Sequence, residues 1–600
     1  MERPTIQPNL KVDDARSYLK TTYGLDFPSE FFFRPESATP DGTFEFALCF
    51  AGSVSAGAYL AGVADFLIEA LDCWEAAKKA GTPGIPTHTV RLNAMSGTSG
   101  GGMTSLILAS ALGRKITPAR AGKSSSLKSA ENPLYATWVK GIDITQLLGV
   151  GDLADEKAKV QSLLDSGRIS TLAQEALTGS SEVVTRSYVA NPLHVGVTIG
   201  NLNGFEHEFA LKGPTAYGYS ARVHEDVVRF SFEYPSPLNV GMPVNPMADP
   251  VDLSARPIGG PLSQWLRPWQ LVGQAAMATG AFPVGLLPRD VVRDWTRCEP
   301  RILPMELGTG GTVALLPALH AGAPTKEYSC LCVDGGTFNN EPFEVARTAL
   351  CGLLGSNKRT GVDAKRAVVM VDPLVVAPGD DFERLRDSDT VMRLISGLVM
   401  RSFVDQSRTH LREWTSAMAE DIYSRYLLAP SKGTASGEDA ICGSVLGAFG
   451  GFLSEAYREH DFRLGRRNCQ RFLQEHFALP ESNPLFNSWR DKAEMQGKYR
   501  CATTDPVTKL ACIPIIPLVG AVTETEPEPT WPSRQEFILV REQIYALLEK
   551  RIDVLYEHLV ADQSWLVRRY LGLGWTFAKP DLLKKVHAAI EDALKAKQLF

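Results

Sequence analysis

A serine flanked by glycines is the residue of this sequence best suited to nucleophilic chemistry. Residues 97–101 read Gly-Thr-Ser-Gly-Gly, a G-x-S-x-G pattern between an expected strand and an expected helix. Glycines on both sides allow the sharp turn that exposes a serine hydroxyl at the end of a strand. The following helix then directs its first N–H groups toward a developing oxyanion. We predict that Ser99 is a nucleophile on an elbow formed with Gly97, Gly100 and Gly101; the alternative is a simple glycine-rich turn.

A second loop of small residues precedes this elbow. Residues 52–57 read Gly-Ser-Val-Ser-Ala-Gly and also connect an expected strand to an expected helix. Small residues let the backbone approach a ligand, so the N–H groups of Gly52, Ser53, Val54 and Ser55 are candidates for an oxyanion hole. The sequence lacks the G-x-x-x-x-G-K-[ST] pattern of a phosphate-binding loop and an acidic residue placed for a dinucleotide ribose. A tight strand-to-helix connection is the structural alternative.

A carboxylate at the end of a third strand is the candidate base. Asp334 follows an expected strand at residues 328–333 and precedes two glycines, a pattern that by itself is mostly a turn signal. None of the ten histidines follows Asp334 in an evident strand-end loop, where the usual Ser-Asp-His order would place one. A carboxylate can instead accept the serine proton directly. The residues favour a Ser99–Asp334 dyad; a Ser-His-Asp esterase using, for instance, His410 is the alternative.

Short apolar strands alternate with helices between residues 44 and 373, and their order sets the expected fold. Continuous apolar runs predict buried strands, and apolar residues at helical spacing predict helices. Residues 114–191 are mainly helical and polar and are interpreted as an insertion. The alternation predicts an α/β fold with a mostly parallel central sheet flanked by helices. The expected strands are residues 44–50, 90–95, 194–199, 227–232, 328–333 and 365–373, the last clear one, and the expected helices are residues 58–70, 103–112 and 269–280.

Beyond this core the pattern becomes helical. Amphipathic segments at residues 390–414 and 537–560 predict helices, and the glycine-rich run at residues 440–453 is interpreted as a buried helix rather than a membrane contact. The expected domains are a lead-in segment at residues 1–43, an α/β core domain at residues 44–386 and a mostly helical region at residues 387–600. Four arginines are expected on a solvated face, with anionic lipid headgroups as the alternative partner: Arg463, Arg466, Arg467 and Arg471.

Composition and charge exclude several classes of protein. Lys and Arg number 62 against 68 Asp and Glu, a formal net charge of −6, which argues against a nucleic-acid-binding protein. The ten cysteines show no paired C-x-x-C spacing, so we expect reduced thiols, no metal and no cofactor. The first residues do not resemble a signal peptide, and no uninterrupted apolar run is long enough for a transmembrane span. We expect a cytoplasmic location.

Further stretches accompany the elbow, the small-residue loop and the aspartate. Residues 57–63 read Gly-Ala-Tyr-Leu-Ala-Gly-Val, residues 276–283 read Ala-Met-Ala-Thr-Gly-Ala-Phe-Pro, and residues 339–342 read Asn-Asn-Glu-Pro. In order and spacing, the whole set resembles the patatin-like phospholipases over residues 44–373.

This resemblance implies a patatin-like α/β core and a defined chemistry. Ser99 would be the nucleophile, Asp334 its partner in a dyad without histidine, and the N–H groups of residues 52–55 the oxyanion hole. The reaction implied is hydrolysis of acyl esters of membrane phospholipids, without a cofactor, by a protein that is peripheral on the membrane.

The sequence departs from the family pattern in the small-residue loop. The family's loop is usually G-G-G-x-[KR]-G, whereas here Ser53 and Val54 replace two glycines and Ala56 stands at the position of the Arg or Lys. Backbone donors do not need glycine side chains, but the missing cation leaves the anchoring of the loop open. A weak or conditional enzyme, a transacylase, a non-phospholipid esterase and an interaction module on a hydrolase scaffold are the alternatives, with a protein activator or an oligomer as further partners.

Overall fold

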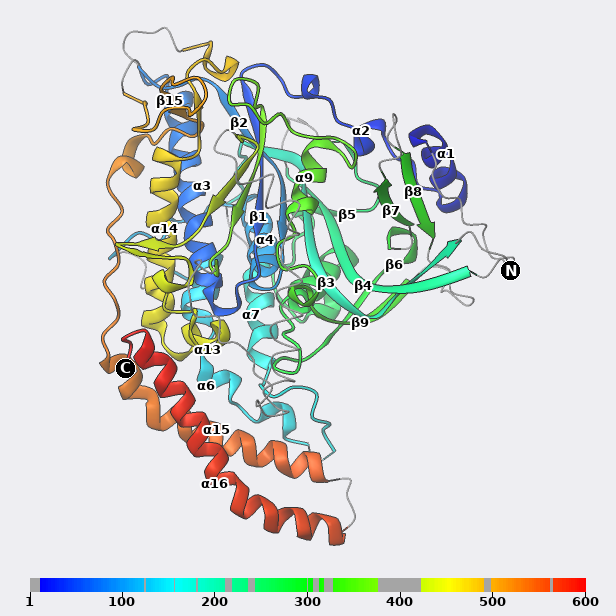
Figure 1. The fold of residues 1–600 in the computed structure, drawn as a ribbon, viewed down its shortest axis with the longest axis vertical. Coiled ribbons are helices and arrows are strands. Elements are labelled where there is room, and N and C mark those ends of the chain that lie inside the picture. Colours follow the sequence, from blue (N-terminus) through cyan, green and yellow to red (C-terminus); the bar gives the residue numbers. More distant parts are fainter. Residues whose placement is uncertain are drawn as a thin grey trace.

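A sheet of nine described strands runs through the centre of the molecule (Figure 1). The computed structural model describes residues 11–122, 126–155, 157–179, 182–210, 218–235, 243–298, 300–305, 312–317, 327–375, 422–489, 498–561 and 565–600. Strands are adjacent in the order β11-β10-β1-β2-β3-β4-β5, and β9 pairs with both β3 and β6. They are β1 (Thr43–Phe50), β2 (Thr89–Gly97), β3 (Val189–Ala210), β4 (Gly218–Glu233), β5 (Asp249–Asp252), β6 (Arg289–Asp294), β9 (Glu327–Asp334), β10 (Arg366–Val371) and β11 (Arg425–Leu428).

Most neighbouring strands are parallel, which confirms the expected fold class. The five strands from β11 to β3 pair in parallel, as do β4 and β5. β3 pairs antiparallel with β4 and with β9, and β9 pairs antiparallel with β6. β3 and β4 are long and consecutive in sequence, so they pair as a hairpin, for which the antiparallel arrangement is the natural one. The sheet is therefore mixed, with its parallel half around β1 and β2.

Helices cover both faces of the parallel half. Alternate residues of β1 enter different cores: Phe46, Leu48 and Phe50 face the core that contains α3, whereas Ala47 and Cys49 face the helix α9. Strands buried on both faces explain the nearly continuous apolar runs in the sequence. The described helices of the core are α3 (Gly57–Lys79), α4 (Gly100–Ala111), α8 (Arg267–Thr279) and α9 (Phe343–Cys351).

The helix α3 is packed against α14 (Glu455–Glu475), which comes from the far end of the chain (Figure 1). A side chain at Gly62 would overlap the carbonyl of Phe462, and one at Gly465 would overlap the carbonyl of Tyr59. The absence of side chains lets the two backbones approach closely. Among the described residues, one helical stretch, Val54–Lys79, is long and apolar enough to cross a membrane, but 94% of its apolar window is buried inside the molecule. Its apolar character therefore follows from its place in the core.

The expected solvated arginine face is wrong for two of its four members. Arg466 is fully buried on α14 and forms ion pairs with Asp65, Glu69 and Glu526. Arg463 is also buried, and it pairs with Glu459 and donates to the carbonyl of Ala119. The carboxylates of α3 are four residues apart and meet Arg466 on one face of that helix. The charge pattern of α14 cannot predict this network, because the carboxylates that pair with Arg466 lie outside α14.

The C-terminal region is largely helical, as expected, but it also completes the sheet. The expectation that residues 365–373 are the last strand is wrong, because β11 pairs in parallel with β10 at Val368↔Arg425. Its four residues carry no alternation, so the neighbouring strand decides their conformation. The helix expected at residues 390–414 lies outside the described residues. β11 pairs with β10, and α14 packs on α3, so both elements contact the core. The expected domain boundary at residue 386 stays a prediction.

The glycine-rich run is buried but is not a regular helix. It forms three short turns, η10 (Gly437–Ala440), α13 (Val445–Ala448) and η11 (Gly450–Leu453). Leu446, Gly447 and Ala448 have φ angles of 57°, 62° and 70°, which an α-helix does not allow. The expected single helix is therefore wrong.

Two further elements surround the core. The insertion contains α5 (Pro133–Tyr135), η3 (Ala136–Gly141), α6 (Ile144–Leu147), η4 (Gly151–Leu153) and α7 (Gly167–Leu177), joined by turns. The helices α15 (Gln535–Val560) and α16 (Trp565–Ala596) form a hairpin that extends from the body (Figure 1). Arg551 of α15 pairs with Asp152 and donates to the carbonyls of Gly149 and Leu163. The hairpin is thereby attached to the insertion. The other described elements are α1 (Val12–Tyr23), α2 (Ser29–Phe32) and the strand pairs β7 (Pro300–Met305) with β8 (Thr312–Pro317), β12 (Ser431–Lys432) with β13 (Ala435–Ser436), and β14 (Ala478–Pro480) with β15 (Cys512–Pro514).

Candidate active site

Ser99 lies on a sharp turn between β2 and α4. Its backbone has φ 54° and ψ −128°, an unfavourable conformation for a residue with a side chain. A side chain at Gly97 would lie 2.6 Å from the Ser105 hydroxyl, and one at Gly101 would overlap the carbonyl oxygen of Phe50 in β1. The glycines of the pattern are thus needed for the close approach of strand and helix.

Asp334 lies at the end of β9 and faces Ser99. The Ser99 hydroxyl donates a hydrogen bond to Asp334 Oδ2 at 2.6 Å, and the N–H of Gly336 donates to Oδ1 at 2.7 Å. Ser99 is 6% exposed and Asp334 is 4% exposed. Burial raises the pKa of Asp334 to about 7, and the hydrogen bonds from Ser99 and Gly336 only partly oppose that rise. A carboxylate with such a pKa can accept and return a proton near neutral pH.

Histidine has no part in this pair within the described part of the chain. No described histidine is hydrogen-bonded to Ser99 or Asp334. His194, on the neighbouring strand β3, instead contacts Ser231 and the carbonyl of Pro243. His410, the histidine of the alternative triad, lies outside the described residues.

The end of α8 connects the nucleophile to the aspartate. The Ser99 N–H donates to Thr279 Oγ1 at 3.0 Å, and the Asp334 N–H donates to the carbonyl of Ala281 at 2.8 Å. The register of β9 against β3 places Asp334 opposite Ile199. Residues 276–283 were singled out in the sequence as a motif, but their role as a bridge between the two halves of the site becomes visible only in the structure.

The small-residue loop lies beside the elbow. A side chain at Gly100 would meet both Ser53 and Val54, so the loop and the first turn of α4 are in contact. The Gly52 N–H donates to the carbonyl of Asn340 at 3.0 Å and is therefore not free to bind an oxyanion. The N–H groups of Ser53 and Val54 donate to no residue that the structure describes. Of the four expected donors, the Gly52 N–H is thus engaged, and the N–H groups of Ser53, Val54 and Ser55 remain within the described residues. Ser53 and Val54 are the two that lie next to Gly100 of the elbow.

A small apolar cavity lies above the dyad. Its volume is about 40 Å³, and Val54, Ser99, Gly100 and Asp334 are among its lining residues. That volume is enough for one or two water molecules and not for an acyl chain. The insertion supplies several of its lining residues from η3 and α7. We call these two elements the roof of the cavity. Besides Val54, the apolar side chains that line the cavity are Met103, Trp138, Ile142, Ile169, Leu172, Phe282, Leu286 and Phe452.

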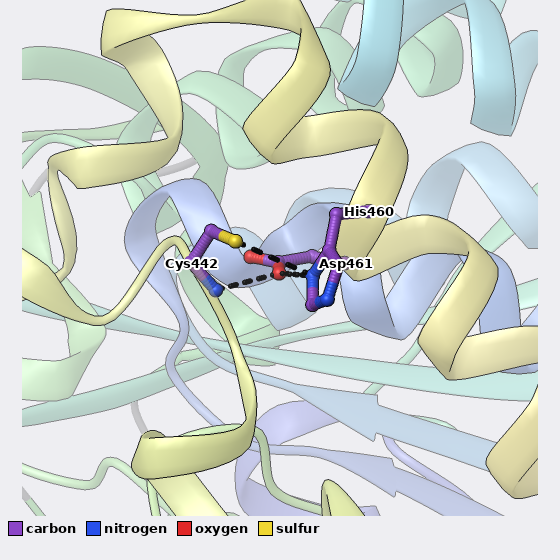
Figure 2. Close-up of side chains that lie close together, drawn as sticks. All are labelled: Cys442, His460 and Asp461. Carbon is purple, nitrogen blue, oxygen red and sulfur yellow. Dashed lines mark hydrogen bonds and ion pairs between the residues drawn. The ribbon is translucent and has the colours of Figure 1, made fainter. Parts of the chain in front are cut away.

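A second cluster, not expected from the sequence, joins the glycine-rich run to α14. Figure 2 shows Cys442, His460 and Asp461, all buried, with their polar atoms facing one another. Thiolate, imidazole and carboxylate are ligands that zinc accepts, and the three ligand atoms lie within 4.8 Å of one another. The sequence showed no such cluster because Cys442 lies 18 residues from His460 and outside any metal-ligand spacing.

The contacts within this cluster are those of a hydrogen-bonded group. His460 Nδ1 lies 2.9 Å from Asp461 Oδ1 and 3.4 Å from the Cys442 sulfur. The N–H groups of Cys442 and Gly443 donate to the two oxygens of Asp461 at 2.8 and 2.7 Å. Burial raises the pKa of the Cys442 thiol well above its usual value, which keeps the thiol protonated. Asp461 therefore serves here as an acceptor for backbone N–H groups.

Comparisons with known proteins identify a relative of this chain and a solved structure that aligns with it. No family model matches it. The uncharacterized protein y4iI of Sinorhizobium fredii (strain NBRC 101917 / NGR234) is 32% identical over 574 residues, which cover 89% of this chain and 78% of that protein. The crystal structure of VipD from Legionella pneumophila aligns with all of this chain and 89% of its own at 12% identity, with a TM-score of 0.20, a similarity too low to support a conclusion. The identity to y4iI extends over most of both proteins, and the chain belongs to the same family as y4iI.

Proposed function

We propose that this protein is a patatin-like lipid acyl hydrolase that cleaves acyl esters of membrane phospholipids with Ser99 and Asp334. The observation that carries the proposal is the 2.6 Å hydrogen bond from the Ser99 hydroxyl to Asp334 Oδ2, two residues that line an apolar cavity. The order of motifs that resembles the patatin-like phospholipases supports the same reaction.

The proposed cycle uses the dyad twice. Ser99 Oγ attacks the ester carbonyl while its proton passes to Asp334. The tetrahedral oxyanion is stabilised by the N–H groups of Ser53 and Val54 and by the first turn of α4. Collapse breaks the ester bond, and the proton from Asp334 passes to the leaving alcohol, the lysophospholipid. Water then attacks the acyl-Ser99 ester, its proton passes to Asp334, and the free fatty acid leaves as that proton returns to Ser99.

The size of the cavity constrains how a lipid reaches Ser99. At about 40 Å³ it is too small for an acyl chain, so we propose that the roof formed by η3 and α7 moves when a lipid binds. The apolar side chains of the roof would then line the acyl chain. We place the protein in the cytoplasm, peripheral on the membrane surface that supplies the substrate, without a metal or cofactor in the reaction.

The test is the release of fatty acid and lysolipid from mixed phospholipid vesicles, measured by mass spectrometry. Wild type is compared with Ser99→Ala and with Ser110→Ala, a control that removes a buried hydroxyl of the same helix without a partner among the described residues. We expect release by wild type and the control and none by Ser99→Ala. Release that persists in Ser99→Ala would contradict the proposal. Transfer of the acyl group to an added alcohol would identify a transacylase using the same dyad.

A further inference from the structure

Ser55, in the small-residue loop, is bound to the C-terminal part of the chain. Its hydroxyl donates to the carbonyl of Ala448 at 2.6 Å and accepts from the N–H of Gly451 at 3.0 Å. Ser55 is buried and does not line the cavity above Ser99. Its side chain therefore ties the loop, on the side away from the cavity, to Ala448 and Gly451, which lie almost 400 positions away in the sequence.

The segment that binds Ser55, residues 441–453, fits closely against the loop. A side chain at Gly451 would lie 2.7 Å from the Ser55 hydroxyl oxygen. One at Gly443 would lie 3.2 Å from that oxygen and 3.5 Å from the Ala56 nitrogen. Glycine at these two positions permits the contact, which accounts for two of the glycines in the glycine-rich run.

Two buried charged residues of α14 hold this segment in place. Asp461 accepts the N–H group of Cys442 at 2.8 Å (Figure 2). It also accepts the N–H group of Gly443 at 2.7 Å. Arg458 donates to the carbonyl of Gly451 at 2.9 Å and, through Nε, to the carbonyl of Val139 in the roof at 2.8 Å. A carboxylate that accepts two N–H groups and a guanidinium that bridges two carbonyls are strong, directional anchors. The contacts run without a break from α14 to Ser55.

The loop needs such support. Val54 has φ 46°, a strained conformation for a residue with a side chain, which persists only when the surroundings impose it. Ala56 gives the loop no charged side chain with which to anchor itself. We infer that residues 441–453, held by Asp461 and Arg458, position the Ser53 and Val54 N–H groups toward the oxyanion, so that Ser55, Asp461 and Arg458 are positioning residues for the reaction. This inference rests on the proposed function.

The test is Ser55→Ala, compared with Tyr59→Phe in the full-length protein. Tyr59→Phe removes a buried 3.1 Å hydrogen bond from α3 to Asn468 of α14, so it weakens the neighbouring contact of α3 with α14 without touching the loop or residues 441–453. Since a displaced oxyanion donor costs roughly 10²-fold in turnover, we expect Ser55→Ala to lower kcat about 10²-fold with little change in KM. Tyr59→Phe is expected to stay within about twofold, while both variants lose similar thermal stability.

An equal fall in kcat for both variants, or a change confined to KM, would overturn the inference, because either result marks a general structural effect. A fluorophosphonate probe separates this failure from failure of the proposed function. Ser99 Oγ attacks its phosphorus and fluoride leaves, so labelling needs the oxyanion donors but no lipid. If wild type releases no fatty acid, slower labelling of Ser55→Ala than of Tyr59→Phe still supports the inference; equal rates, or no labelling of wild type, contradict it.

Discussion

The two sides of the candidate active site are held in different ways. Ser99 and Asp334 are positioned by elements of residues 44–373: Thr279 accepts the Ser99 N–H, and the Ala281 carbonyl accepts the Asp334 N–H. The loop at residues 52–57 is held at Gly52 by the carbonyl of Asn340 and at Ser55 by residues 441–461. The dyad residues thus lie within one set of sequence motifs, whereas the support of Ser55 in the loop comes from outside it. This difference teaches that the C-terminal region contributes contacts to the candidate active site.

The largest expected effect tests the dyad side. Ser99→Ala should lower the rate of fatty acid release at least about 10⁴-fold, since residues of a catalytic unit cost this much when removed. The double variant with Asp334→Ala should be no slower than Ser99→Ala, because the two residues act together. Release rates from phospholipid vesicles measure both. Further loss in the double variant would mean that Asp334 has a role apart from Ser99.

On the dyad side, the buried carboxyl of Asp334 should lower the free energy of unfolding at high pH. Its pKa is raised from 3.8 to about 7 by burial, so the folded state keeps a proton that the unfolded state loses between these values. Stability then falls as pH rises from about 4 to 7, by roughly 4 kcal/mol from 1.36 kcal/mol per pH unit. Asn offers one acceptor oxygen where Asp offers two, which costs about 1 kcal/mol.

Asp334→Asn should therefore be more stable than wild type by about 3 kcal/mol at pH 8 and should lose this advantage near pH 4. Urea unfolding at the two pH values measures the difference. An advantage of equal size at both pH values would show that ionisation of Asp334 is not its cause.

A double-variant cycle sharpens the loop side of the comparison. Asp461→Ala leaves the N–H groups of Cys442 and Gly443 without their acceptor, and we expect roughly 10²-fold lower kcat, with Asp461→Asn in between because it keeps one acceptor oxygen. Combined with Ser55→Ala, the loss should be smaller than the product of the single losses, because both act on one chain of contacts. Multiplicative losses, measured as kcat in the vesicle assay, would separate Asp461 from the loop.

The smallest expected effect is the pH dependence of turnover. The dyad needs ionised Asp334, so the rate should rise with pH through the pKa of about 7 and level off above it. At pH 6 the rate should be about tenfold below the plateau. Ser55→Ala should lower the plateau without moving the midpoint, since Ser55 does not touch Asp334. A shifted midpoint in that variant would mean that the two sides of the site are electrostatically coupled.

Much of the site could be predicted because its signals are local. A glycine-flanked serine between strand and helix, and a carboxylate at a strand end, are visible in short stretches, and the structure places Ser99 and Asp334 within hydrogen-bond distance. The set of oxyanion donors was less accessible, because the Gly52 N–H is bound by Asn340 from another part of the chain. The buried position of Arg466 escaped prediction for the same reason: its carboxylates lie on α3.

The sequence by itself determined the elbow, the strand-end aspartate, the alternation of strands and helices and hence the α/β class, since hydrophobic periodicity and glycine conformation act over a few residues. Only the tertiary structure decided that four residues at Arg425–Leu428 extend the sheet, that residues 441–453 bend into turns around Ser55, and that Asp461 accepts backbone N–H groups. Each of these depends on hydrogen bonds between residues far apart in the chain. The spacing of residues within a short stretch of sequence therefore cannot predict these partners.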